Sequence, residues 1–343
     1  MRATPPYVPG EQPKAGAQVI KLNTNENPYP PSPRVLDAMG RGLAETLRLY
    51  PDPDATALRR RAASVYGVPV DSILVGNGSD ELLSLLVRAV VDPGGAVAYP
   101  VPTYSLYRTL VDLHEARAVE VPFPGDWRLP PALAEVEASL TFLCNPNAPS
   151  GTVVPIAQIA ELARRVHGVL VVDEAYVDFA ADHALRLLPD YPNVVVLRTL
   201  SKSFSLAGLR VGLAFAHPDL IDGLRTVKDS YNVNRLTQLG AEAALGDLPV
   251  MERNVERIRA TRTVLIAELE QLGFTVPPSE ANFVLARRAG RSMAPVARAL
   301  AARGILVRHF AVNGLDDALR ITVGTDEEIA AFLAALRAVL AGG

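Results

Sequence analysis

The chain has 343 residues, of which 49% are hydrophobic and 21% are charged, and its formal net charge is −3. This length exceeds what one hydrophobic core comfortably fills, so two domains are expected. The small net charge gives no reason to expect a nucleic acid or an anionic membrane as partner. No apolar run approaches the ~18 residues of a membrane span, and the N-terminus lacks the apolar stretch of a signal peptide. The only cysteine, Cys144, excludes an intrachain disulfide and fits a reducing compartment, so a cytoplasmic protein is expected.

The N-terminal two thirds of the chain predict an arm followed by an α/β domain. Residues 1–32 are rich in proline and are expected to form an extended arm that packs over the ligand site and the smaller domain. Residues 33–245 alternate short β-branched runs with amphipathic stretches, which is typical of a mostly parallel sheet sandwiched by helices. The seven expected strands are Ile73–Val75, Ala96–Tyr99, Ala118–Pro122, Leu140–Cys144, Val169–Asp173, Val194–Arg198 and Val211–Phe215.

Residues 246–343 predict a smaller α+β domain. A long helix over Pro249–Leu272 is expected to end at Gly273, a usual helix stop. Short strands and two further helices alternate after it. The expected strands are Phe274–Val276, Phe283–Ala286, Leu306–Arg308 and Leu319–Val323, and the expected helices are Met293–Arg303 and Asp326–Leu340.

Chemistry-bearing residues follow two neighbouring buried strands. Val169–Asp173 ends in a carboxylate, and the next strand runs into Thr199, Ser201, Lys202 and, eight residues after the lysine, Arg210. A lysine can form a Schiff base with an aldehyde, and an aspartate can protonate a pyridine nitrogen. Hydroxyls and an arginine can hold a phosphate dianion. Because ligands bind at the carboxyl ends of parallel strands, this edge of the sheet predicts a site for a phosphorylated aromatic cofactor.

Three other motifs follow predicted strands. The turn GNGSDE at 76–81 opens a helix, so its backbone N–H groups can bind an anion, although many such turns only reverse the chain. Tyr104 either stacks on a flat ligand or closes the core. NPNAPSG at 145–151 predicts a rigid loop in which a cis-proline is plausible. Cys144 is interpreted as a buried apolar residue, and the five histidines show no metal spacing, so no metal is expected.

Together these motifs resemble the fold-type I aminotransferases that depend on pyridoxal 5′-phosphate (PLP), and within them the chain is similar to the histidinol-phosphate aminotransferase family. The resemblance runs essentially from end to end and is carried by several distinctive segments in the family's order. These are PYVPG at 6–10, LNTNENP at 22–28, LYPD at 49–52, GNGSDE, NPNAPSG, VVDEAYVDF at 171–179, TLSKSFSLAGLR at 199–210 and LRITVGT at 319–325.

The resemblance implies the cofactor and a role for each matching residue. Lys202 would hold PLP and act as general base and acid, Asp173 would pair with the pyridine nitrogen, and Tyr176 would hydrogen-bond the phenolic oxygen. Tyr104 would stack on the ring. The residues implied around the phosphate are Gly78, Ser79, Asp80, Thr199, Ser201 and Arg210, with Tyr50 reaching it from the partner subunit of a homodimer.

One position departs from the family pattern. The asparagine that usually precedes Pro-Thr/Ser-Gly, and that would donate to the phenolic oxygen, is Ala148 here. Loss of one donor is expected to leave the phenolate less stabilised. Asn147 is a candidate cofactor contact only if the loop shifts to bring it there.

The implied substrates are histidinol phosphate and the glutamate/2-oxoglutarate pair. The resemblance assigns the substrate's anionic group to Arg320, with Arg308 and Tyr7 beside it. Two arginines and a tyrosine suit a phosphate dianion better than one arginine does. Arg308 can alternatively form an ion pair that packs the domains together. Asn25 and Tyr231 are candidates to line the pocket near the imidazole.

Three other functions remain open on the sequence. An aromatic amino-acid aminotransferase on the same scaffold is the nearest, and a PLP-dependent decarboxylase acting on a phosphorylated amino acid is the second. The third is a PLP-binding regulator that has lost catalysis, although no DNA-binding appendage is visible. A nicotinamide oxidoreductase is disfavoured because the chain lacks a dinucleotide fingerprint.

Overall fold

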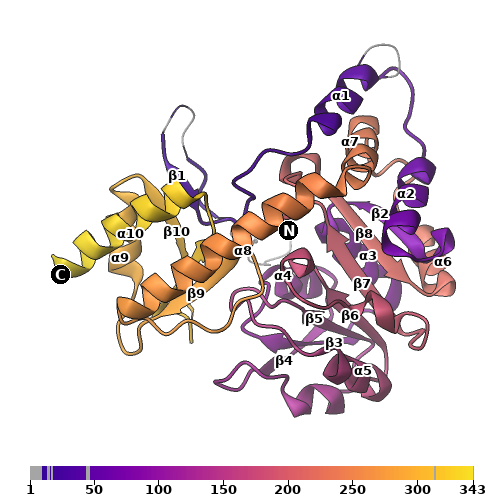
Figure 1. Cartoon of the computed structure of the whole chain (residues 1–343). Coiled ribbons are helices and arrows are strands. Elements are labelled where there is room, and N and C mark those ends of the chain that lie inside the picture. Colours follow the sequence, from indigo (N-terminus) through magenta and orange to yellow (C-terminus); the bar gives the residue numbers. More distant parts are fainter. Residues whose placement is uncertain (1–9, 14–15, 17, 44–46, 313, 343) are drawn as a thin grey trace.

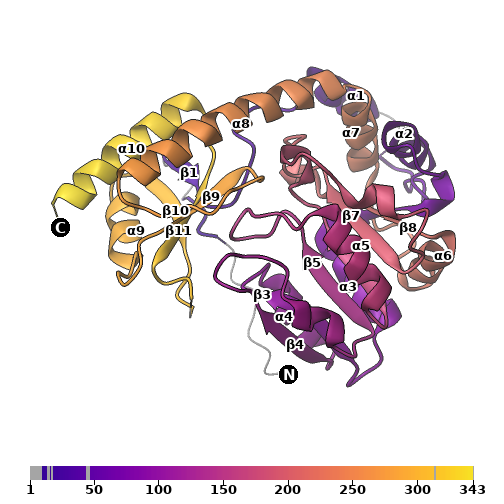
Figure 2. The ribbon, with the colours of Figure 1, turned by 60° about the horizontal axis from the view of Figure 1, so that its bottom comes forward.

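The structure is a computed structural model that describes residues 10–13, 16, 18–43, 47–312 and 314–342. A large sheet and a small sheet occupy opposite sides of the molecule, and helix α8 (Leu248–Gln271) runs along both parts (Figures 1 and 2). In the described part of the chain, no helix is both long enough and apolar enough to cross a membrane.

The large sheet confirms the prediction of seven mostly parallel strands. Only β8 runs antiparallel to its two neighbours, and every other pair in the sheet is parallel. The strand order is β2 (Ile73–Asn77), β8 (Val211–Ala216), β7 (Val194–Thr199), β6 (Val169–Asp173), β5 (Leu140–Cys144), β3 (Ala96–Val101) and β4 (Arg117–Pro122).

The central strands are apolar throughout because helices cover both faces of the sheet. In β7, Val195 and Leu197 face one buried cluster while Val194 and Val196 face the other. One face packs against α3 (Ser79–Val90), α4 (Leu106–Leu113) and α6 (Pro218–Val227). The other packs against α2 (Thr56–Tyr66), α5 (Ile156–Arg165) and α7 (Arg235–Leu245). Burying one Val or Leu side chain contributes roughly 1.5–3 kcal/mol, so these strands hold the polar residues at their ends rigidly.

The small sheet consists of β1 (Ile20–Leu22), β10 (Ile305–His309), β11 (Ala318–Thr322) and β9 (Phe283–Arg287) in that order. Helices α9 (Ala294–Ala301) and α10 (Asp326–Ala341) belong to the same part of the chain. Strand β1 comes from the N-terminal segment and pairs in parallel with β10, a strand that the sequence does not predict.

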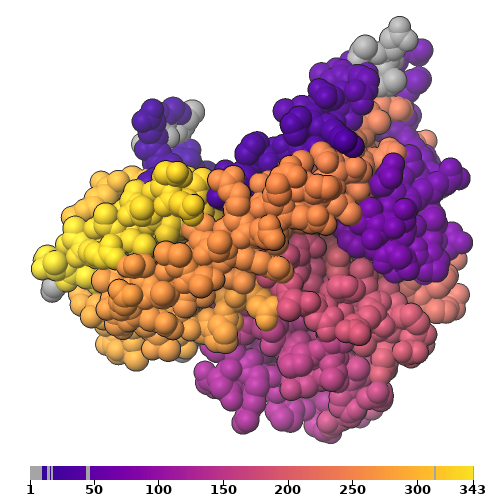
Figure 3. All heavy atoms as spheres, in the orientation of Figure 1, coloured from indigo at the N-terminus to yellow at the C-terminus, as the bar shows by residue number. Residues whose placement is uncertain are grey.

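The predicted strand Phe274–Val276 is wrong. Only Thr275 pairs, in a single bridge to Arg287. Gly273 has a positive φ of 81°, and two prolines without N–H donors follow Val276, so the pairing cannot extend. Helix α1 (Pro33–Gly42) packs on α7 and stands out from the body of the molecule (Figure 3).

Candidate active site

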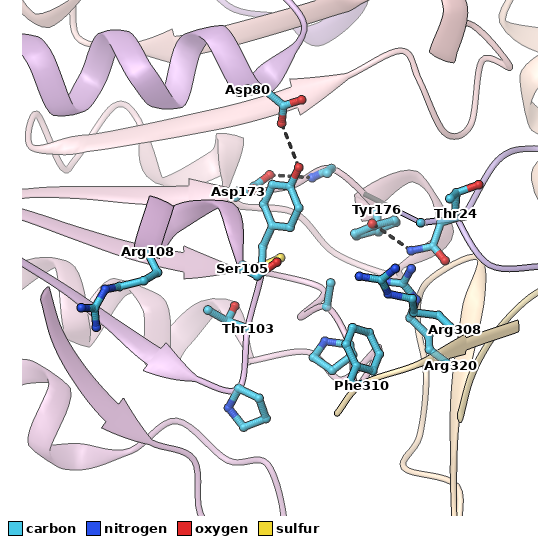
Figure 4. Close-up of a pocket in the computed structure, with 18 of the residues that line it drawn as sticks. Thr24, Asp80, Thr103, Ser105, Arg108, Asp173, Tyr176, Arg308, Phe310 and Arg320 are labelled. Carbon is cyan, nitrogen blue, oxygen red and sulfur yellow. Dashed lines mark hydrogen bonds between the residues drawn. The ribbon is translucent and has the colours of Figure 1, made fainter. Parts of the chain in front are cut away.

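A cavity of about 880 Å³ lies between the two sheets, at the carboxyl ends of the large-sheet strands (Figure 4). Arg308 and Arg320 of the small sheet reach it from the side opposite Asp173. The residues predicted from the sequence that line this cavity are Asn25, Ser79, Asp80, Tyr104, Asp173, Tyr176, Thr199, Ser201, Lys202, Arg210, Arg308 and Arg320.

Lys202 follows β7 and is held in a desolvated position. Its Nζ donates to the Thr24 carbonyl at 3.4 Å and lies 5.6 Å from the centre of the Tyr176 ring. Burial, followed by the like charge of Arg320, lowers the pKa of Lys202 to about 8. The backbone carbonyl of Lys202 accepts from Asn27 Nδ2 at 3.0 Å. The amine is therefore fixed at the cavity wall and is more readily deprotonated than an exposed lysine.

Asp173, the last residue of β6, is a buried carboxylate with two donors. Its Oδ2 accepts from the Tyr107 hydroxyl at 2.8 Å, and its Oδ1 accepts from the Ala175 N–H at 3.2 Å. Burial raises the pKa of Asp173 to about 6, against the opposing effect of these hydrogen bonds. Tyr107 is absent from the sequence prediction, because nothing in the α4 sequence marks its hydroxyl as facing β6.

The GNGSDE turn brings Asp80 and Arg210 together. Arg210 Nη2 donates to Asp80 Oδ2 at 2.8 Å, and the Tyr104 hydroxyl donates to Asp80 Oδ1 at 3.1 Å. Gly78 has φ 86°, and a Cβ there would lie 2.7 Å from Arg210 Nη2, so the position requires glycine. Gly78 itself does not line the cavity, but Ser79 at the N-terminus of α3 does.

The hydroxyls after β7 lie against this turn. Thr199 Oγ1 is 2.9 Å from both Ser201 Oγ and the Val211 carbonyl oxygen. On the neighbouring strand, a Cβ on Gly212 would lie 2.5 Å from the Ser79 backbone nitrogen. This close approach groups two hydroxyls, a helix N-terminus and a guanidinium at one end of the cavity, which is a suitable set of donors for a phosphate.

Tyr176 and Asn25 form a hydrogen-bonded pair. Asn25 Nδ2 donates to the Tyr176 hydroxyl oxygen at 3.0 Å, while Asn25 Oδ1 accepts from Thr322 Oγ1 at 3.1 Å. The Asn25 backbone is left-handed, with φ 57°. Burial raises the pKa of Tyr176, so its hydroxyl keeps its proton at neutral pH. Because its oxygen accepts from Asn25, that proton is available to an acceptor in the cavity.

The structure corrects the prediction that Asn147 contacts the cofactor. Its Oδ1 accepts from Thr103, and its Nδ2 donates to the Pro102 carbonyl and to Ser150 Oγ, so the amide holds its own loop together. It does not line the cavity, whereas Ala148 does. The peptide bonds before Pro146 and Pro149 are both cis, as the motif suggested. Cys144 is buried as expected.

The two predicted arginines are register partners on β10 and β11. Both guanidinium carbons lie 5.5 Å from the centre of the Phe310 ring, and Arg320 Nη2 donates to the Asn23 carbonyl at 3.0 Å. His309 directly follows Arg308 in the sequence. Its Nε2 lies 3.1 Å from Asp316 Oδ1, so it is a packing residue. Tyr7 lies outside the described residues.

Tyr50 and Tyr231 stack on each other away from the cavity. Their ring centres are 4.5 Å apart at 17°, and they are 76% and 48% exposed. Tyr231 therefore does not line the cavity of its own chain, contrary to the prediction. Within the residues that the structure describes, no group of three or more His, Cys, Asp or Glu side chains could hold a metal.

Comparisons with known sequences agree over nearly the whole chain. The family described as aminotransferase class I and II matches residues 17–336. Histidinol-phosphate aminotransferase 1 of Nostoc sp. is 48% identical over 335 residues, covering 97% of this chain and 95% of that protein. Histidinol-phosphate aminotransferase of Geotalea uraniireducens is 47% identical over 333 residues, covering 97% and 96%.

Solved structures agree with the fold. Histidinol-phosphate aminotransferase from Sinorhizobium meliloti, in complex with pyridoxal-5′-phosphate, has a TM-score of 0.87 at 30% identity over 94% of this chain and 91% of that one. Aspartate aminotransferase from Thermus thermophilus with maleate, at 22% identity, shares the fold with a TM-score of 0.83 over 94% and 92%. The chain therefore belongs to the class I and II aminotransferases, PLP-dependent enzymes of fold-type I, and within them to the histidinol-phosphate aminotransferase family.

Proposed function

We propose that the chain transfers an amino group between L-histidinol phosphate and 2-oxoglutarate, giving imidazole-acetol phosphate and L-glutamate in histidine biosynthesis. The observation that supports this reaction most directly is the convergence of Lys202, Asp173 and two arginines on one cavity. Lys202 and Asp173 suit the cofactor, whereas Arg308 and Arg320, which line the cavity from the small sheet, suit the anionic end of a substrate.

The donors that this chain places around the cavity fit PLP. Arg210, Ser79 and the hydroxyls after β7 suit its phosphate, while Asp173 and Tyr176 suit the pyridine nitrogen and the phenolic oxygen. When bound, the cofactor supplies an aldehyde that takes the amine and a ring that accepts electrons. Lys202 Nζ accepts and returns a proton beside the reacting carbon, and its pKa of about 8 suits both directions near neutral pH.

The arginine pair favours a phosphorylated donor. Arg308 and Arg320 lie side by side on adjacent strands, so two guanidiniums face one anionic group. A phosphate ester carries more negative charge than a carboxylate and gains more from the second guanidinium. Glutamate and 2-oxoglutarate reuse the same pair with the α-carboxylate, which takes the place of the phosphate ester. The guanidinium carbons of Arg308 and Arg320 each lie 5.5 Å from the centre of the Phe310 ring, which packs over both groups.

The test is the absorbance spectrum of the protein with PLP, taken before and after adding L-histidinol phosphate without an acceptor. Loss of the visible cofactor band, with a rise in the pyridoxamine phosphate band, supports the proposal. A shift with phenylalanine but not with histidinol phosphate moves the assignment to an aromatic aminotransferase, and CO₂ release moves it to a decarboxylase. Lys202→Ala should remain folded but lose the visible band and turnover, whereas turnover at the wild-type rate would contradict the role of Lys202.

We propose that two copies of the chain form the active unit. Large apolar side chains that are at least half exposed lie on and at the end of α1, which stands out from the molecular surface (Figure 3), and at residues 47–50. They are Leu36, Leu43, Leu47, Leu49 and Tyr50. A cluster of this kind is typical of a protein–protein interface and is costly to leave in water. Tyr50 belongs to the cluster and lies outside its own cavity, so it is available to a second copy.

Mixed dimers test the exchange of Tyr50. Tyr50→Ala and Lys202→Ala are each expected to be nearly inactive alone. Dissociated and reassociated together, they form hybrids in which one of the two sites has both native residues, which restores up to about a quarter of wild-type activity. If Tyr50 acts within its own chain, no hybrid site is native and the mixture stays inactive. Light scattering of Leu47→Glu, beside Val264→Glu on α8 as an exposed control, tests the interface directly.

The state of Cys144 bears on the compartment in which the chain works. The single cysteine is buried and has no disulfide partner, and burial raises the pKa of its thiol. We propose that the chain works in the cytoplasm, where thiols stay reduced.

A further inference from the structure

We propose that Tyr107 is a positioning residue for the reaction, because its hydroxyl fixes the Asp173 carboxylate in its ionised form, facing the pyridine nitrogen of the cofactor. This inference rests on the proposed use of PLP. It assigns a role to a residue that the sequence motifs do not mark.

Tyr107 is held in place by aromatic contacts on several sides. It lies in the first turn of α4 and is fully buried. Its ring stacks on Phe142 of β5 with centres 4.6 Å apart at 17°, and it meets Tyr104 and Tyr99 edge-on at 5.7 and 5.9 Å. The hydroxyl therefore has little freedom, and it points at Asp173 Oδ2 at 2.8 Å.

This bond decides how the carboxylate is oriented. Oδ2 is occupied by Tyr107 and Oδ1 by the Ala175 N–H, while Asp173 still lines the cavity. Two donors on different elements, α4 and the turn after β6, fix the plane of the carboxylate. An ionised carboxylate in this plane can accept a hydrogen bond from the protonated ring nitrogen and stabilise its positive charge, whereas a neutral carboxyl has no charge with which to do so.

Burial raises the pKa of Asp173 and so favours the neutral acid. The hydrogen bond from Tyr107 lowers that pKa and favours the ionised carboxylate. The other charged and titratable groups that influence Asp173 come from four further places. They are Asp80 at the start of α3, Cys144 at the end of β5, Tyr176 after β6 and Lys202 after β7. Among these, Lys202 favours the ionised form and Asp80 opposes it. The Tyr107 hydroxyl acts more strongly than either, because it donates directly to the carboxylate.

Tyr107→Phe removes one oxygen and keeps the aromatic packing. Tyr99→Phe is the matched control, because Tyr99 is also buried in this aromatic group but donates to Glu120 at 3.0 Å. In the protein without cofactor, the infrared carboxyl band of Asp173, identified by its loss in Asp173→Asn, should titrate at higher pH in Tyr107→Phe than in wild type. The PLP dissociation constant should rise about tenfold or more, since hydrogen bonds to charged groups are the stronger kind.

A double variant separates positioning from general stability. If Tyr107 acts only through Asp173, then Tyr107→Phe should weaken PLP binding little further in an Asp173→Asn background. An unchanged Asp173 titration in Tyr107→Phe, or full additivity of the two substitutions, would overturn the proposal. Failure of the PLP assignment looks different, because then wild type itself would not bind PLP while the infrared titration would still report on Tyr107.

Discussion

The lowered pKa of Lys202 predicts a reactive amine in the protein without cofactor. An amine with the ordinary pKa of 10.5 is neutral in roughly 0.03% of molecules at pH 7, whereas a pKa of about 8 gives roughly 9%. The structure therefore provides on the order of 300 times more neutral amine than an exposed lysine. Burial is the main cause and Arg320 the next, so the effect should exist before any cofactor binds.

The assay is competitive acylation of the cofactor-free protein at a series of pH values. The extent of labelling of Lys202 is read from its peptide by mass spectrometry, with N-α-acetyl-lysine in the same tube as reference. Nucleophilicity falls together with pKa, so the pH of half-maximal reaction is more informative than the absolute rate. That midpoint should lie near pH 8 for Lys202.

Arg320→Met tests the cause of the shift. Methionine keeps much of the side-chain volume but removes the like charge, so the midpoint for Lys202 should move up while staying below the reference, because burial remains. If labelling of wild-type Lys202 keeps rising to pH 10 in parallel with the reference amine, the reasoning from burial is refuted. A midpoint that Arg320→Met leaves unchanged would refute the contribution of the arginine.

Three further outcomes are expected. Glu174→Gln should lower the free energy of unfolding by about 2 kcal/mol in urea titration, because it removes the nearer carboxylate of the buried Arg198 guanidinium, 3.0 Å away, and leaves only Asp178 at 3.9 Å. Gly212→Ala should weaken PLP binding at least about tenfold by equilibrium dialysis, because its Cβ would lie 2.5 Å from Ser79 N. Without cofactor, Asp173→Asn should be more stable than wild type by on the order of 3 kcal/mol at pH 8 and roughly half that at pH 5, by the same titration.

The sign of the Asp173 prediction follows from its raised pKa. A carboxyl whose pKa is about 6 in the folded chain and 3.8 as its ordinary value binds its proton more tightly when folded. Its contribution to stability is fully present below about pH 4 and is lost as the pH rises through 6. Above pH 6 the folded chain without cofactor buries an ionised carboxylate, which asparagine avoids. Equal pH dependence of the two proteins would contradict this account.

The large sheet could be predicted because its strands carry their own signal. A strand buried on both faces is apolar at every position, so a run such as Val194–Leu197 is recognisable in isolation. The three-residue strand Ile20–Leu22 has no such signal, since it exists only through pairing with Ile305–Val307 far along the chain. Phe274–Val276 failed for the opposite reason, because its composition favours a strand but the prolines that follow prevent pairing.

The same division holds at the site. Asp173, Thr199 and Lys202 lie where the sequence places them, since each directly follows a strand of recognisable type. Their partners are set by tertiary packing. Tyr107 is 66 residues from Asp173 and Thr322 is 297 residues from Asn25, and no local pattern connects them. The structure does not bring Asn147 to the cavity, because its amide hydrogen-bonds Thr103 and Ser150, and no local pattern marks those partners.

The cavity holds two groups in charge states that the protein alone disfavours. Burial works against the ionised form of Asp173 and against the ammonium of Lys202. A cofactor with a basic ring nitrogen and an aldehyde relieves both costs at once, since it gives the carboxylate a cationic partner and consumes the amine. Because it binds the folded chain selectively, it should stabilise that chain by RT ln(1 + [L]/Kd), about 2.7 kcal/mol at 100 Kd. The cost of burying these two charges therefore both makes the site reactive and links the stability of the folded chain to binding of the cofactor.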